Sequence, residues 1–80
     1  MNNSESIQQA IENTRKVMRD TDIGIIREAV AEHYNMLGVS VDDDGCVQIA
    51  PSDDDTYGWR GLGDHEIMTL AATARRIERA

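Results

Sequence analysis

Two runs of three aspartates are the residues of this chain with the clearest capacity for chemistry. They are Asp42-Asp43-Asp44 and Asp53-Asp54-Asp55. Clustered carboxylates can hold a divalent cation, serve as a general acid and base, or attract a basic partner. Each of these roles needs a different set of neighbouring residues, so the neighbours decide between them.

The first run partly matches a calcium-binding loop. With Gly45 at the sixth position of an EF-hand loop, Asp42 and Asp44 fall at the third and fifth. Ser40 and Pro51 then stand at the first and twelfth positions, where the pattern requires Asp and a bidentate Glu. Because two ligands are missing, we expect neither a metal site nor a cofactor.

The remaining candidates for catalysis are Cys46, His33 and His65. Nucleophilic catalysis needs a base and an orienting group beside the nucleophile, and no such partner accompanies Cys46 in the sequence. His33 lies at the edge of an apolar helical stripe, and we interpret it as a boundary histidine. Paired carboxylates of the glycosidase type need a cleft, for which 80 residues leave little room. We therefore predict no catalytic residue and no enzyme activity.

The acidic residues are unevenly distributed. Eight of the 15 lie between Asp42 and Glu66, where Arg60 is the only base, so this segment carries the whole net charge of −7. Contacts to phosphate need Lys and Arg, so direct binding of nucleic acid is disfavoured and a basic partner is favoured. The alternative, to which we give equal weight, is that the acidic residues only keep a small protein soluble.

We predict that the partner-binding residues are the acids of this segment and its two aromatic residues: Asp42, Asp43, Asp44, Asp53, Asp54, Asp55, Tyr57, Trp59, Asp64 and Glu66. Tyr and Trp are frequent in binding hot spots. For Trp59 a place over the core, with its N–H on a polar partner, is the preferred alternative. The reason is that the chain has no Phe and few other large residues to fill a core.

The length of 80 residues predicts a single domain, with residues 1–3 frayed. No apolar run approaches the roughly 20 residues of a membrane span, and the N-terminal stretch is polar. One cysteine cannot form an internal disulfide. These features lead us to expect a cytoplasmic protein that does not contact a membrane.

Apolar periodicity predicts three helices, over about residues 4–19, 23–37 and 64–78. The short linker between the first two predicts that they pack antiparallel, and Gly38 fits the position after the second helix. The glycines of residues 58–63 make a helix unlikely there and allow a short strand. The expected order is α-α-β-β-(short β)-α, a two-layer α+β domain with its helices on one face of a small antiparallel sheet.

Residues 39–51 predict a β-hairpin, because an Asp-Gly pair separates two alternating apolar runs. A three-residue loop with Gly45 left-handed sets Val41 opposite Val47 and Val39 opposite Ile49. This register gathers four β-branched side chains on one face, and a shift by one residue would turn them to water. Pro51 cannot donate to a ladder and closes the second strand.

In overall profile the chain resembles the small phage-encoded anti-CRISPR proteins. The features that carry the resemblance are its size, the net charge of −7, the carboxylate clusters at 42–44 and 53–55 and the absence of a catalytic motif. The resemblance implies an inhibitor that mimics DNA, binds the basic surface of a CRISPR effector complex and blocks target-DNA binding. It rests on no shared motif and therefore implies no individual functional residue.

A homodimeric structural or adaptor protein without mimicry is the alternative. An over-wide apolar arc on the second predicted helix, few large core residues and an unpaired hairpin edge favour a homodimer. The two functions differ in salt dependence, because only the acidic complex should weaken steeply as ionic strength rises.

Overall fold

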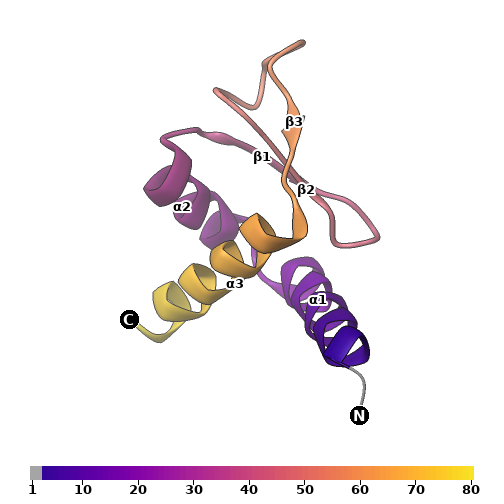
Figure 1. Ribbon diagram of the computed structural model, residues 1–80. Coiled ribbons are helices and arrows are strands. Elements are labelled where there is room, and N and C mark those ends of the chain that lie inside the picture. Colours follow the sequence, from indigo (N-terminus) through magenta and orange to yellow (C-terminus); the bar gives the residue numbers. More distant parts are fainter. Residues whose placement is uncertain (1–2) are drawn as a thin grey trace.

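The computed structural model describes residues 3–80 and confirms the α+β architecture in the expected order. Its elements are α1 (Asn3–Asp20), α2 (Ile23–Tyr34), β1 (Gly38–Val41), β2 (Val47–Ala50), β3 (Arg60–Gly61) and α3 (Asp64–Arg79). Figure 1 shows the three helices on one side of the small sheet. Of the residues expected to be frayed, 1 and 2 lie outside the described residues, whereas Asn3 already belongs to α1.

The sheet is antiparallel in the order β1-β2-β3. Val39 pairs with Ile49 and Val41 with Val47, which confirms the predicted register. Val39, Val47 and Ile49 are buried and Val41 is half-buried, so this face packs on the helices. In a register shifted by one residue, these side chains would face solvent. Their burial therefore stabilises the observed register relative to shifted ones.

The turn of the hairpin is closed by two backbone bonds. The Gly45 N–H donates to the Asp42 carbonyl, and the Asp42 N–H donates to the Cys46 carbonyl, both at 3.0 Å. Gly45 has φ +80°, the left-handed conformation expected of it. It also lies against the backbone of Arg15 in α1, where an added Cβ would meet the Arg15 Cβ at 2.7 Å.

The first two helices do not form the predicted antiparallel pair. Both pack on α3 and have few contacts with each other, and in Figure 1 α2 continues away from α1 rather than folding back along it. Ala71 and Ala74 are buried on α3. Small side chains of this kind leave room for a neighbouring helix to pack closely.

The second helix is shorter than predicted. It ends at Tyr34, and Asn35 takes the left-handed C-cap conformation (φ 54°) that Gly38 was expected to provide. Asn tolerates this conformation because its side chain can hydrogen-bond locally. Residues 35–37 instead lead into the sheet, where the Leu37 N–H donates to the Pro51 carbonyl at 3.2 Å.

Most of the wide apolar arc of α2 is covered within the chain, while Ile23 at the start of the helix stays exposed. Ile26, Ala29 and Val30 are buried, and the helix packs on α3 and on β1. The other buried members of the core cluster come from α1, β1, β2, the residue after β3 and α3: Met18, Val39, Val47, Ile49, Leu62, Ile67, Leu70, Ala71 and Ala74.

Candidate functional site

The two aspartate triplets lie at opposite ends of the hairpin. Asp42–Asp44 form the turn between β1 and β2, and Asp53–Asp55 follow the far end of β2. Strands of four residues separate them, which corresponds to about 13 Å at the usual rise per residue. The triplets therefore belong to two separate ends of the molecule and do not form one continuous cluster.

One carboxylate in each triplet holds its own loop together. Asp42 accepts the backbone N–H groups of Asp44 and Cys46, each at 2.9 Å. Asp55 accepts the N–H groups of Tyr57, at 2.9 Å, and of Gly58. Such bonds from Asp to the backbone ahead of it are the usual reason for Asp in turns. Asp42 and Asp55 thus stabilise their own loops, although both were predicted as partner-binding residues.

Three further predicted residues form ion pairs. Asp53 pairs with Arg27 of α2 at 3.1 Å, and Asp64 pairs with Arg15 of α1 at 2.6 Å. Glu66 lies 3.6 Å from Arg60. The bases for Asp53 and Asp64 come from helices distant in sequence, so the charge segregation of the sequence is partly undone in space. Only the i to i+4 spacing on a helix is a pairing signal readable from sequence, and neither pair has it.

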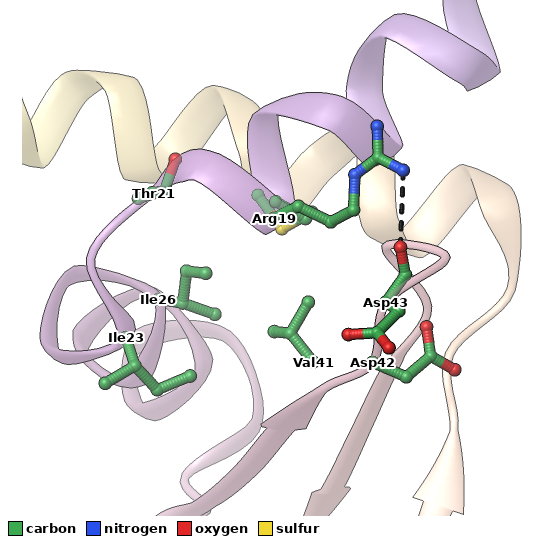
Figure 2. Close-up of a pocket in the computed structure, with 8 residues that line it drawn as sticks. Arg19, Thr21, Ile23, Ile26, Val41, Asp42 and Asp43 are labelled. Atoms are coloured by element: carbon green, nitrogen blue, oxygen red, sulfur yellow. Dashed lines mark hydrogen bonds between the residues drawn. The ribbon is translucent and has the colours of Figure 1, made fainter.

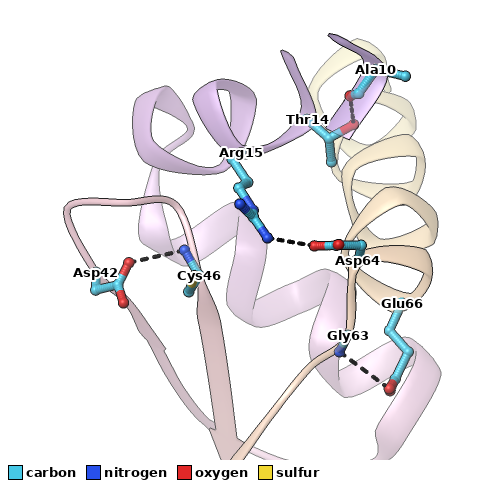
Figure 3. A network of polar contacts seen from close by, with 8 residues as sticks. All are labelled: Ala10, Thr14, Arg15, Asp42, Cys46, Gly63, Asp64 and Glu66. Atoms are coloured by element: carbon cyan, nitrogen blue, oxygen red, sulfur yellow. Dashed lines mark hydrogen bonds and ion pairs between the residues drawn. The ribbon is translucent and has the colours of Figure 1, made fainter. Parts of the chain in front are cut away.

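Arg15 connects the hairpin tip to the start of α3 (Figure 3). Its hydrogen bond and charge interaction with Asp64 raise the pKa of the guanidinium, and Cys46 and Asp44 act in the same direction more weakly. Because Gly45 also packs on the Arg15 backbone, this residue fixes where the first triplet sits on the molecule.

Asp43, Asp44 and Asp54 are exposed. No hydrogen bond or ion pair of their carboxylates is found within residues 3–80, apart from the weak attraction between Asp44 and Arg15. These three carboxylates are available to a partner, as is the second carboxylate oxygen of Asp42, because both backbone N–H groups bond to its Oδ1.

The loop between β2 and β3 extends away from the helices in Figure 1 and presents Tyr57 with 94% of its surface exposed. Asp55 organises this loop, since its carbonyl also accepts the Trp59 Nε1–H at 2.6 Å. Trp59 is half-buried in the loop and does not pack on the core cluster. The prediction that Trp59 covers the core is therefore wrong. Its N–H does have the polar partner that was expected.

Glu66 is the centre of a second polar group, beside the sheet. It accepts the Tyr34 hydroxyl at 2.9 Å and the Gly63 N–H at 3.4 Å. The Tyr34 bond, followed by the Gly63 bond, lowers the pKa of Glu66. Burial, followed by the bond to Glu66, raises the pKa of Tyr34. The Arg60 guanidinium also lies 5.4 Å from the centre of the Tyr34 ring.

Tyr34 is partly buried and packs against the core cluster. The Tyr34 hydroxyl was the one feature of the sequence that could have indicated its bond to Glu66, because a half-buried Tyr usually finds a polar partner for its O–H. His33, read as a boundary residue, lies with Nε2 2.6 Å from the Thr73 hydroxyl. Cys46 is half-buried.

Within the described residues, no three side chains of His, Cys, Asp or Glu are placed so that they could hold a metal ion. No helix in that part of the chain has both the length and the apolar content to cross a membrane. Exposed carboxylates lie at both ends of the hairpin, and the exposed Tyr57 lies at one of them. Comparison of the chain with protein-family models, with curated proteins and with solved structures gave no match.

Proposed function

We propose that this protein is a non-enzymatic inhibitor of the anti-CRISPR type. It binds the basic surface of a nucleic-acid-binding complex in the host cytoplasm and blocks binding of target DNA. The observation that supports the proposal is the loop of residues 51–59, which presents both the exposed Tyr57 and the exposed carboxylate of Asp54.

An ordered loop with an exposed tyrosine is suited to protein recognition. Tyrosine contributes a large contact area with little side-chain freedom to lose, and it is enriched at binding hot spots. Asp55 restrains the loop through the Tyr57 and Gly58 N–H groups and the Trp59 indole. The loop therefore loses little further conformational entropy when a partner binds.

The charge distribution favours a basic partner over nucleic acid itself. Four of the eight basic residues already pair with carboxylates: Arg15, Arg27, Arg60 and Arg76. The unpaired acids Asp43 and Asp54 stand at the two ends of the hairpin, where they would speed encounter with a positively charged groove. A groove that holds DNA has this charge, so a protein seated there would exclude DNA.

The test is a competition assay with purified CRISPR effector complexes of several types. Binding of labelled target DNA is followed by gel mobility shift as the protein is added. Wild type should displace DNA from at least one effector, and Tyr57→Ala or Asp54→Asn should need at least tenfold more protein. Met68→Ala and Glu78→Gln are matched exposed controls outside the loop and should behave as wild type. Undiminished DNA binding to every effector contradicts the proposal.

A homodimeric adaptor is the second candidate function. It is favoured by two exposed apolar side chains, Ile23 at 43% and Leu37 at 61%. Ile23 is the large apolar residue of α2 that remains exposed, whereas Ile26 and Val30 are buried. Binding through apolar contacts of this kind should change little between low and high salt, whereas the acidic inhibitor should lose affinity.

A further inference from the structure

A cleft separates the start of α2 from the hairpin and is distinct from the Tyr57 loop. Its volume is about 310 Å³, at the lower end of the range for ligand pockets. Four apolar and four polar residues line it: Met18, Ile23, Ile26, Val41, Arg19, Thr21, Asp42 and Asp43. In Figure 2 the side chains of Ile23, Ile26 and Val41 lie on one side and the carboxylates of Asp42 and Asp43 on the other.

The apolar side of the cleft is open to solvent at Ile23, which is 43% exposed, whereas Met18 and Ile26 at its base are buried. An apolar side chain placed there would remove Ile23 and Val41 from water. The apolar area buried by such an occupant would be that of a single side chain, in keeping with the small volume of the cleft.

The acidic side of the cleft selects the charge of the occupant. The Asp43 carboxylate has no ion-pair partner within residues 3–80, and Asp42 bonds only to backbone N–H groups. Arg19, the one base of the cleft, directs its guanidinium to the Asp43 backbone carbonyl at 3.3 Å rather than to a carboxylate. A second copy of this chain would bring its own net charge of −7 to these acids. A basic occupant is therefore favoured over self-association.

The adjacent strand offers backbone groups to an extended occupant. β1 is an edge strand, and the Asp42 N–H points to β2 because it bonds to the Cys46 carbonyl. Antiparallel pairing alternates, so the N–H and C=O of Val41 point away from β2. Asp53 covers the other end of this edge, where its carboxylate accepts the Val39 N–H at 3.4 Å. An added strand can thus pair only near Val41, next to the cleft.

We propose that this cleft binds an extended peptide segment of a partner protein, with one aliphatic side chain in the apolar pocket and a following Lys or Arg at Asp42 and Asp43. The inference rests on the proposed function in one respect, that the partner is basic. It adds a second contact, at the opposite end of the hairpin from Tyr57.

The probe is the peptide acetyl-Thr-Val-Leu-Lys-Arg-Thr-amide, titrated into isotope-labelled protein and followed by amide chemical shifts. Shifts should concentrate at Thr21, Ile23, Val41 and Asp43, with a dissociation constant of about 1 mM or tighter. Replacing the peptide leucine with serine, or its Lys-Arg with Glu-Glu, should weaken binding at least tenfold. In the protein, Ile23→Gln and Asp43→Asn should each weaken binding of the original peptide at least tenfold as well.

Met68→Gln is the matched control, because Met68 is 40% exposed on another helix, and it should leave the affinity within about twofold. No localised shift at about 10 mM peptide, or equal binding of the serine peptide, overturns the inference. Shifts at the same amides on raising the protein concentration alone would identify a second copy as the occupant and overturn it equally. The DNA competition assay tests the Tyr57 loop separately, so the two proposals can fail independently.

Discussion

Glu66 shows how one carboxylate can join three parts of the chain. It accepts the Tyr34 hydroxyl from α2, accepts the Gly63 N–H at the start of its own helix and pairs with Arg60 of β3. Its pKa is lowered from the ordinary 4.5, chiefly by the Tyr34 bond. The pKa of Tyr34 is raised from the ordinary 10.0, chiefly by burial. Both shifts connect these contacts to the pH dependence of stability.

The signs of the two shifts predict a stability plateau. A lowered carboxyl pKa contributes stability that is present above 4.5 and is lost as pH falls through the lower folded-state value. A raised tyrosine pKa contributes stability below 10.0 that is lost as pH rises through the raised value. In urea unfolding measured across pH, Tyr34→Phe should reduce the acid-side loss and remove the alkaline-side contribution of Tyr34. Superimposable profiles for the variant and wild type would contradict this account.

Gly45 is required for two reasons that act together, its positive φ and its contact with the Arg15 backbone. Gly45→Ala should lower the free energy of unfolding by at least about 1–2 kcal/mol, the cost of the left-handed conformation alone. Gly61→Ala is the matched control, because a Cβ there meets nothing within 4 Å. Urea unfolding of both variants measures the difference, and an equal effect would argue against the tight packing of the hairpin on α1.

Among the elements, α3 is the one on which both other helices pack. Its buried face contains Ala71 and Ala74, and Ala72 lies exposed on the same helix. The buried Ala71 and Ala74 leave little space for larger side chains on this face of α3. The last helix in the sequence is thus the centre of the helical layer.

This arrangement predicts a large difference between neighbouring alanines. Ala74→Leu should destabilise the protein by about 1–3 kcal/mol, because the added methyl groups have no space in a packed interface. Ala72→Leu should change stability by no more than about 0.5 kcal/mol, as is usual for exposed positions. Thermal or urea unfolding measures both, and similar stabilities for the two variants would mean that α3 is not packed as described.

The homodimer remains a prediction about the whole molecule. The structure leaves less exposed apolar surface on α2 to support it than the sequence suggested. Most of the apolar arc of α2 is buried inside the chain, and Ile23 is what remains of it at the surface. A dimer through this helix should show twice the monomer mass of 8.9 kDa by light scattering in reductant. Ile23→Gln should reduce the mass to that of the monomer, and Met68→Gln should not. A monomer mass for wild type at every concentration would exclude the homodimer.

The sequence by itself determined the order of the elements and the hairpin with its register. Local signals are sufficient there, because alternation of apolar residues and the Asp-Gly pair act over a few neighbouring positions. It also determined the charge of the segment from Asp42 to Glu66. The end of α2 was misplaced because Asn35 took the role expected of Gly38, and both residue types can end a helix.

Only the tertiary structure decided which helices pack together and which carboxylates are available. Arg15 and Asp64 are 49 positions apart in sequence, and their ion pair exists because α1 crosses the start of α3. No periodic signal in the sequence encodes such a crossing, which depends on the fit of side chains between elements. The same packing placed the two aspartate triplets at opposite ends of the hairpin and formed the cleft between α2 and β1.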